Sequence, residues 1–133
     1  MKYEAPEFVS PEFNGVPTFA YAVSDKDNIE TMIACTKAEI HACQKSHYLQ
    51  APAPFYFLRV AILARKQKNY ALEVSICTVF LDHIEKWLAA IAKKGYRPGR
   101  DIADASAGPS AEKIRSRLPK ARALLESTKA QKP

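Results

Sequence analysis

Residues 57–80 read FLRVAILARKQKNYALEVSICTVF, and this stretch decides the fold. Its first part, 57–64, is apolar on nearly every side of a helix, with Arg59 as the exception. Such a helix should be buried on more than one face. The polar run at 66–69 (KQKN) then forms a turn, and its cations suit a helix C-terminus, where unpaired carbonyls carry partial negative charge. The stretch therefore predicts two antiparallel helices, at about 54–68 and 70–94, joined as one hairpin.

The second helix of this hairpin carries one apolar stripe, with Phe80 and Trp87 beside it. The members of the stripe follow steps of three and four residues: Tyr70, Val74, Cys77, Leu81, Ile84, Leu88 and Ile91. Gly95 should end the helix, because glycine tolerates the left-handed conformation past the last turn. We expect Ala61 to mark the closest approach of the two helices. The residues expected to be buried between them are Leu63, Val74, Cys77, Leu81 and Ile84.

Two further helices flank the hairpin. Before it, Ser24 is a candidate N-cap with Asp27 in the first turn, and apolar residues recur at helical spacing, which predicts a helix at about 25–48. After it, residues 96–110 (YRPGRDIADASAGPS) have the composition of a loop, and Ser110 is a candidate N-cap of the last helix. Pro119 lies inside that last helix and should kink or split it.

Residues 1–23 are predicted to be an extended arm, because proline interrupts both helices and central strands. The prolines of this segment are Pro6, Pro11 and Pro17. A short hairpin turning at Asn14-Gly15 is the alternative, since Asn-Gly suits a type I′ turn. The fold class that follows is all-α. It is a single four-helix domain at 24–130, built around the hairpin at about 54–94, with a proline-containing N-terminal arm.

The hairpin resembles one tetratricopeptide-type repeat, whose pattern is a set of large and small residues at fixed offsets. The residues that carry the resemblance are Phe57, Val60, Ala61, Tyr70 and Phe80, and Glu73 stands where that pattern has a small residue. The match covers about 34 residues and has no second copy, so the flanking helices would replace neighbouring repeats. The stretch is similar to small bacterial and phage proteins with a lone hairpin of this type. The resemblance implies protein binding through a helical surface, not catalysis.

The residues proposed to bind a partner protein lie on the first helix of the hairpin and in its turn: Arg59, Arg65, Lys66 and Lys68. Arg59 interrupts an apolar helix, so its guanidinium must reach water or an acid. A salt bridge with Glu73 or another acid is one interpretation, and a carboxylate or phosphate ligand is the other. The leading hypothesis is a non-enzymatic adaptor or inhibitor that engages another protein.

The net charge of +6 is unevenly distributed. Residues 1–50 hold 4 Lys/Arg against 7 Asp/Glu, whereas residues 93–133 hold 11 against 4. A basic C-terminal third could neutralise nucleic-acid phosphates. The candidate residues for that alternative are Lys93, Lys94, Arg97, Arg100, Arg115 and Arg122. An ordinary solvated helix face explains the same charges, and a self-associating structural protein or a small-ligand binder using Arg59 also stays open.

The sequence offers no familiar catalytic, metal or cofactor motif. It has no G-x-S-x-G, H-E-x-x-H or P-loop pattern, and only 4 glycines. Cys43 and His47 share a helix face, but Cys35 and His41 fall on its two flanks, which disfavours a zinc site. We therefore expect no catalytic residues, no metal and no cofactor.

The sequence also gives an expectation for the compartment. Three cysteines without a C-x-x-C pair predict reduced thiols in a cytoplasmic protein. No apolar window reaches the length of a membrane span, and the N-terminus has no apolar segment typical of a signal peptide. A membrane partner is therefore not expected.

Overall fold

The computed structural model describes residues 8–130 of the chain. Within that range the protein is mostly helical, which confirms the all-α class in its broad form. The elements are β1 (Glu12–Phe13), β2 (Val16–Pro17), the 3₁₀ turn η1 (Thr18–Ala20), α1 (Tyr21–Ser24), α2 (Ile29–Lys45), α3 (Pro54–Lys66), α4 (Tyr70–Lys93) and α5 (Pro109–Ala130). No helix in the described range is both long enough and apolar enough to cross a bilayer.

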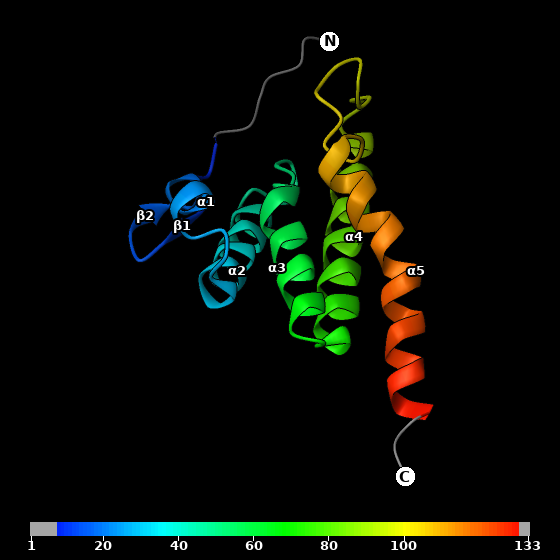
Figure 1. The fold of residues 1–133 in the computed structure, drawn as a ribbon. Coiled ribbons are helices and arrows are strands. Elements are labelled where there is room, and N and C mark those ends of the chain that lie inside the picture. The colour runs from blue at the N-terminus through cyan, green and yellow to red at the C-terminus, as the bar shows by residue number, and fades with distance from the viewer. Residues whose placement is uncertain (1–7, 131–133) are drawn as a thin grey trace.

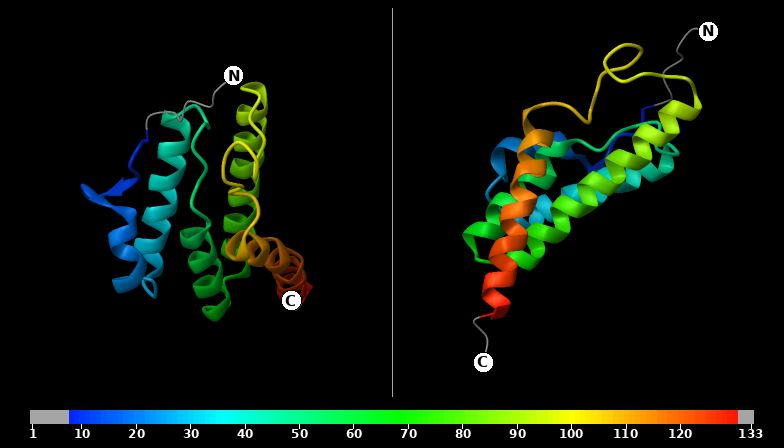
Figure 2. Two further views of the ribbon diagram at one scale, coloured as in Figure 1. Left: turned by 90° about the horizontal axis from the view of Figure 1, so that it is seen from above. Right: turned by 90° about the vertical axis from the view of Figure 1, so that its right-hand side faces the viewer.

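The helices pack largely in chain order. α3 and α4 run antiparallel as one hairpin, and α2 lies on the other side of α3 (Figure 1). α5 contacts both α3 and α4 and crosses them at an angle, while the small N-terminal sheet sits beside α2 (Figure 2). The central helix α3 is therefore covered by three neighbours, which explains why its sequence is apolar on nearly every side.

The N-terminal segment is not an extended arm over its described length. β1 and β2 pair antiparallel, with Phe13 opposite Val16, and Asn14 and Gly15 both take positive φ at the turn. The hairpin alternative is therefore the one that the structure has, followed by two short helical turns up to Ser24. The part of the predicted arm at 1–7 lies outside the described residues.

The start of α2 also differs from the prediction. Ser24 ends α1 instead of capping the next helix. Asn28 is the N-cap of α2, and its side chain accepts a hydrogen bond from the Thr31 backbone N–H at 3.1 Å. The expected helix at 25–48 is thus shorter at both ends. The cause is local, because an Asn cap satisfies the free amides as well as a Ser cap would.

Three helices end in the same hydrogen-bonded motif. In each, the residue two positions past the helix end has positive φ: His47, Lys68 and Gly95. The backbone N–H of the following residue then donates to the carbonyl five residues earlier, as Tyr48 does to the Cys43 carbonyl at 2.7 Å. This is the Schellman motif, in which glycine usually holds the left-handed position. Of the three left-handed positions, only position 95 holds a glycine. The sequence therefore predicted the end of α4 within one residue, but it predicted the end of α2 three residues too late.

The buried stripe of α4 is rotated from the predicted one. The members of the stripe are Glu73, Ile76, Cys77, Phe80, Ile84, Trp87 and Ile91. Val74 and Leu81, which were expected in the core, are half-buried at its margin, whereas Ala61 and Leu63 are buried as expected. α4 packs against α5 as well as α3, so more than one of its sides is covered, and both Phe80 and Trp87 are buried.

A buried carboxylate joins three helices. Glu73 on α4 is fully buried. Arg65 on α3 contacts both of its oxygens, with Nε donating to Oε1 at 2.9 Å and an NH2 nitrogen 2.7 Å from Oε2. Arg117 on α5 donates from Nε to Oε2 at 3.0 Å. This cluster fastens the last helix to the hairpin, and α5 runs unbroken through Pro119 instead of splitting there.

Candidate functional site

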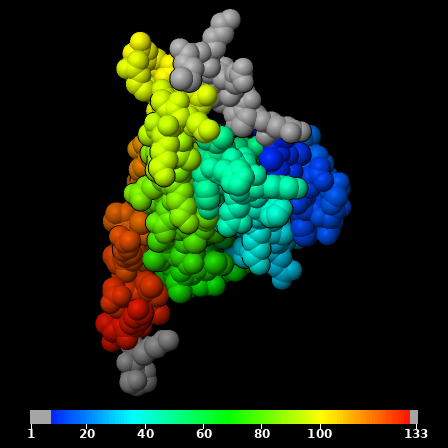
Figure 3. Space-filling model, turned by 180° about the vertical axis from the view of Figure 1, so that it is seen from behind, coloured from blue at the N-terminus to red at the C-terminus, as the bar shows by residue number. Residues whose placement is uncertain are grey.

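A hollow beside α4 follows from the unequal lengths of α3 and α4. α4 has 24 residues and α3 has 13, so α4 is longer by roughly 16 Å at the usual rise per residue. The C-terminal half of α4 therefore extends past the start of α3. The connection at 46–53, between α2 and α3, lies alongside this free half of α4 (Figure 3).

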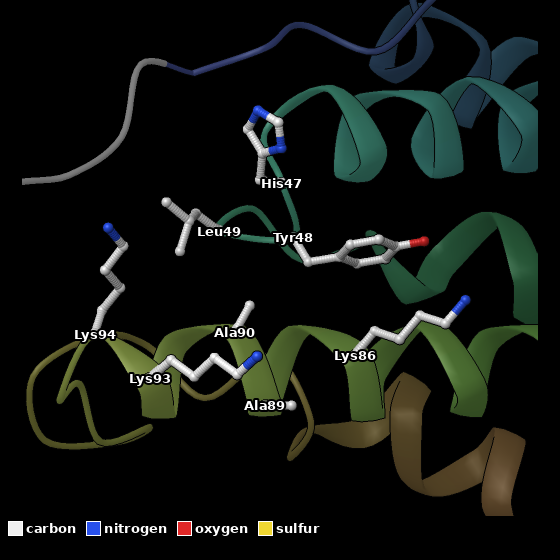
Figure 4. Close-up of a pocket in the computed structure, with 8 residues that line it drawn as sticks. All are labelled: His47, Tyr48, Leu49, Lys86, Ala89, Ala90, Lys93 and Lys94. Atoms are coloured by element: carbon white, nitrogen blue, oxygen red, sulfur yellow. The ribbon is translucent and has the colours of Figure 1, made fainter.

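A hollow of about 490 Å³ opens between that connection and α4. We call it the Tyr48 hollow, and it is lined by His47, Tyr48, Leu49, Lys86, Ala89, Ala90, Lys93 and Lys94. The two alanines lie on the helix surface, the Tyr48 ring lies between the connection and α4, and Lys94 reaches up from the helix end (Figure 4). The result is a small-residue floor with an aromatic wall and a rim of ammonium groups.

The wall of the hollow is held in an unusual backbone conformation. His47 and Tyr48 have φ values of 55° and 61°, in the left-handed region that residues with a side chain seldom adopt. Such residues cost on the order of 1–3 kcal/mol each and persist only where the surrounding structure holds them. Here the Tyr48 hydroxyl lies 3.0 Å from Nδ1 of His83, and the two rings stack with centroids 5.7 Å apart.

The hollow is electropositive. Among residues 8–130, its lining contains three lysines and no Asp or Glu, and the nearest acids on the same helix, Asp82 and Glu85, lie just before Lys86. Nζ of Lys86 sits 5.6 Å from the centre of the Tyr48 ring. Burial lowers the pKa of His83 below 6.5, and Lys86 lowers it further, while Asp82 opposes them. His83 is therefore neutral near pH 7, and the fixed charge of the site comes from its lysines.

The residues predicted to bind a partner protein do not meet at one place. Arg59 pairs with Asp27 at 2.6 Å and donates to the Lys26 carbonyl, so the acid it reaches is Asp27, not Glu73. Arg65 is held in the Glu73 cluster described above. Lys66 and Lys68 are exposed at the α3–α4 turn, at the opposite end of α4 from the Tyr48 hollow (Figure 1). Their role in partner binding stays a prediction.

The residues predicted for nucleic acid are divided between two surfaces. Lys93 and Lys94 line the Tyr48 hollow, and Arg97 and Arg100 follow in the exposed loop after α4. The other two, Arg115 and Arg122, lie on α5, where Arg115 pairs with Glu112 at 2.7 Å and Arg122 is exposed. The structure thus brings only part of this set to the hollow.

Sequence reasoning missed most of the Tyr48 hollow. His47 and Tyr48 carry no turn signal, because the position that usually holds glycine is filled by histidine. A usable signal existed on α4, where Lys86, Ala90 and Lys93 recur at steps of four and three and so share a helix face. These three residues are equally typical of a solvated helix face, because nothing in the sequence shows that the connection at 46–53 lies beside them.

The described residues include neither a metal-ligand cluster nor an exposed thiol. No group of three His, Cys, Asp or Glu in this part of the chain could hold a metal ion. The free thiols Cys35, Cys43 and Cys77 are buried, and burial is the main cause that raises their pKa values to about 11, 12 and 11. A thiol is a weak nucleophile when it stays protonated. Comparisons of the chain with protein-family models, curated proteins and solved structures find no match.

Proposed function

We propose that this protein is a non-enzymatic binding module that takes an acidic, partly apolar segment of another protein into the Tyr48 hollow. The single observation that carries the proposal is the pairing of a lysine rim, without Asp or Glu among the described residues, with a floor of small apolar residues. The proposal keeps the function class predicted from the sequence. The proposed site lies beside the C-terminal half of α4 and not at the α3–α4 turn.

The charge of the rim selects the partner. Lys86, Lys93 and Lys94 each present an ammonium group with three donors and no acceptor, so carboxylates of a partner are suitable counter-ions. Complementary charge raises the association rate and excludes basic partners more than it adds affinity. Specific affinity must therefore come from the hollow itself.

The floor supplies that affinity. A volume of about 490 Å³ falls in the range of ligand sites, and Ala89 and Ala90 leave room for a large side chain beside Leu49. Burial of apolar surface contributes roughly 25 cal/mol per Å². A leucine or phenylalanine flanked by Glu or Asp would satisfy both the floor and the rim.

Nucleic acid is the second candidate, and the loop residues Arg97 and Arg100 favour it. Sequence-tolerant binding of single strands combines a basic groove with aromatic faces on which bases stack. The Tyr48 ring is poorly placed for stacking, because His83 stacks on it and Lys86 approaches it within 5.6 Å. The protein-segment hypothesis is therefore the stronger of the two.

The wider architecture is part of the same proposal. We infer that α3 and α4 correspond to a lone tetratricopeptide-type hairpin, with α2 and α5 in the places of neighbouring repeats. The support is their antiparallel packing, the contact of the Phe57 and Phe80 rings between them, and the full burial of Ala61. A cytoplasmic location and a possible homo-oligomer remain hypotheses of the same kind.

The test compares two probes at about 0.15 M salt, where surface charges are screened beyond about 8 Å. One probe is a peptide of alternating Glu and Leu, and the other is a single-stranded oligonucleotide of equal charge. Titration followed by ¹H–¹⁵N spectra should show peptide-induced shifts centred on Leu49, Ala89 and Ala90. A tighter oligonucleotide complex with shifts along 94–108 would overturn the proposal in favour of the second candidate.

Two variants sharpen the result. Charge reversal of Lys86, Lys93 and Lys94 to Glu should weaken peptide binding at least tenfold, and Ala90→Trp should block the hollow without changing its charge. The matched control reverses Lys113, Lys120 and Arg122, which are exposed on α5, and should leave the peptide affinity within about twofold. Equal losses in both triple variants would mean that net charge alone drives binding.

A further inference from the structure

A second pocket lies on the other side of the connection at 46–53. It has a volume of about 350 Å³ and is walled by the N-terminal segment, the connection and the start of α3. Gln50 belongs to this pocket, whereas its neighbour Leu49 belongs to the Tyr48 hollow. The two sites therefore share one connection but not their lining residues.

A buried carboxylate faces this pocket without a cationic partner. Glu39 is only 4% exposed, and its oxygens accept hydrogen bonds from the Thr18 hydroxyl at 3.0 Å and the Ala53 backbone N–H at 2.8 Å. Both donors are neutral. No ion pair within residues 8–130 includes Glu39, and no Lys, Arg or His of that range lines the pocket.

The contrast with the other buried acid is direct. Glu73 is compensated by two arginines, as buried carboxylates generally must be. Glu39 has only two hydrogen bonds, although a carboxylate can accept about four. Burial raises the pKa of Glu39 above 4.5, because the ionised form has lost its water without gaining an opposite charge. A purely structural role, in which Glu39 joins Thr18 to Ala53, would explain the two hydrogen bonds. It would not explain why this position holds a carboxylate and not the neutral amide of a glutamine.

The wall of the pocket suits a cation rather than an anion. Four prolines line it, and proline has no backbone N–H to donate: Pro11, Pro17, Pro52 and Pro54. The Gln50 amide is already used, since it both accepts from and donates to the Val9 backbone. Phe8 and Phe19 stand at the pocket with 72% and 74% of their surface exposed. Aromatic faces attract ammonium groups.

We propose that this pocket binds an organic ammonium group on an apolar stem, with the ammonium at Glu39 and the stem against the aromatic and proline wall. A free amine and the side chain of a lysine both present that chemistry. The ligand would supply the opposite charge that Glu39 lacks. This site would act independently of the Tyr48 hollow and would have the opposite charge preference.

The experiment uses three ligands that share a ring and differ in charge: benzylammonium, benzyl alcohol and benzoate. Titration calorimetry and ¹H–¹⁵N spectra of the full chain should show benzylammonium binding at least tenfold more tightly than benzyl alcohol, and no binding of benzoate. Shifts should centre on Thr18, Glu39 and Ala53. Binding should also weaken as the pH falls through the pKa of Glu39, because the ionised form of Glu39 is the one that pairs with the ligand.

Variants separate a binding site from a purely structural role. Glu39→Gln should abolish the preference for benzylammonium over benzyl alcohol, while the matched control Glu30→Gln, at an exposed acid of α2, should preserve it. Should Glu39→Gln not fold, Phe19→Ala serves instead, since that ring is largely exposed. It should weaken benzylammonium about threefold and keep the charge preference.

Peptides with one lysine or one acetyl-lysine distinguish the two sources of the ammonium group. Tighter binding of the lysine peptide than of benzylammonium would assign the site to a protein side chain, and weaker binding would assign it to a free amine. Equal binding of benzylammonium and benzyl alcohol, or shifts away from Glu39, would overturn the proposal.

Discussion

The Tyr48 hydroxyl and the His83 ring meet at 3.0 Å across 35 residues of chain, one from the α2–α3 connection and one from α4. The contact joins the connection to the free half of α4, and its direction depends on the protonation of the imidazole, because Nδ1 accepts in one neutral tautomer and only donates in the charged ring. Protonation would turn Nδ1 into a donor and bring a positive charge close to Lys86. The wall of the Tyr48 hollow therefore carries a built-in dependence on pH.

The first prediction concerns that dependence. Because the pKa of His83 is lowered on folding, the unfolded chain binds a proton more readily below about pH 6.5. The contribution of His83 to stability should be complete above that value and be lost as the pH falls through the lower pKa of the folded state. Melting temperatures of the wild type and of His83→Phe, measured between about pH 7 and pH 5, should differ in slope.

The pH dependence of stability expected from Glu39 is opposite to the one expected from His83. A Glu39 variant therefore provides a control in the same series of measurements. Its pKa is raised above 4.5, so its contribution is complete below that value and is lost as the pH rises through its folded-state pKa. Glu39→Gln should reduce the loss with rising pH and leave the His83 effect in place. An unchanged acid slope in His83→Phe would show that another group governs it.

The second prediction concerns the cluster around Glu73. Glu73→Ala would leave Arg65 and Arg117 partly buried without their acid, and the removal of one partner from a buried pair costs about 3–5 kcal/mol. Denaturant unfolding measures the change. Glu112→Ala breaks the exposed pair with Arg115 and should stay within about 0.5 kcal/mol of the wild type. Similar values for both variants would argue against the cluster as the fastening of α5.

The third prediction concerns helix ends. His47→Gly and Lys68→Gly place glycine at left-handed positions, and each should stabilise the fold by about 0.5–1 kcal/mol, since the relief of strain exceeds the entropy that glycine loses. Gly95→Ala is the reciprocal change and should cost about 1 kcal/mol, although a Cβ there would meet no atom within 4 Å. Thermal unfolding measures all three. A destabilised His47→Gly would show that the imidazole makes a contact worth more than the strain.

The fourth prediction tests the crossing of α3 and α4. Ala61 is fully buried, and the rings of Phe57 and Phe80 pack nearby with centroids 5.2 Å apart. Ala61→Leu should overpack this interface and cost about 1–3 kcal/mol. Ala71→Leu, at an exposed position of α4, adds the same side chain and should be nearly neutral. Equal stability of the two variants would mean that the core absorbs the extra volume.

The hairpin was predictable because its signals are local. Apolar residues at helical spacing, a polar turn at 66–69 and Gly95 place α3 and α4 within two residues of their observed ends. The end of α2 was not predictable in the same way. A histidine at the left-handed position gives no sign of a stop, so the helical pattern was extended to 48.

The sites depend on pairs that are distant in the sequence. Glu73 interrupts an apolar stripe, and its second partner, Arg117, lies 44 residues later. The apolar stripe predicted from periodicity therefore left Glu73 out, although Glu73 lies on the buried face of α4. Glu39 gave no signal either, because Thr18 and Ala53 reach it from a segment expected to be an extended arm and from the α2–α3 connection. In both cases the missing information is which distant segment packs against the acid.

The three buried thiols allow local opening of the fold to be measured by chemical labelling. A protonated, buried thiol reacts with an alkylating reagent only when its surroundings transiently separate. Cys35 and Cys43 lie on α2, whereas Cys77 lies on α4 within the hairpin. The labelling rates of Cys35 and Cys43 therefore report the departure of α2, and the labelling rate of Cys77 reports the opening of the hairpin. Mass spectrometry of the labelled peptides would rank the cooperative units of the fold without a single engineered residue.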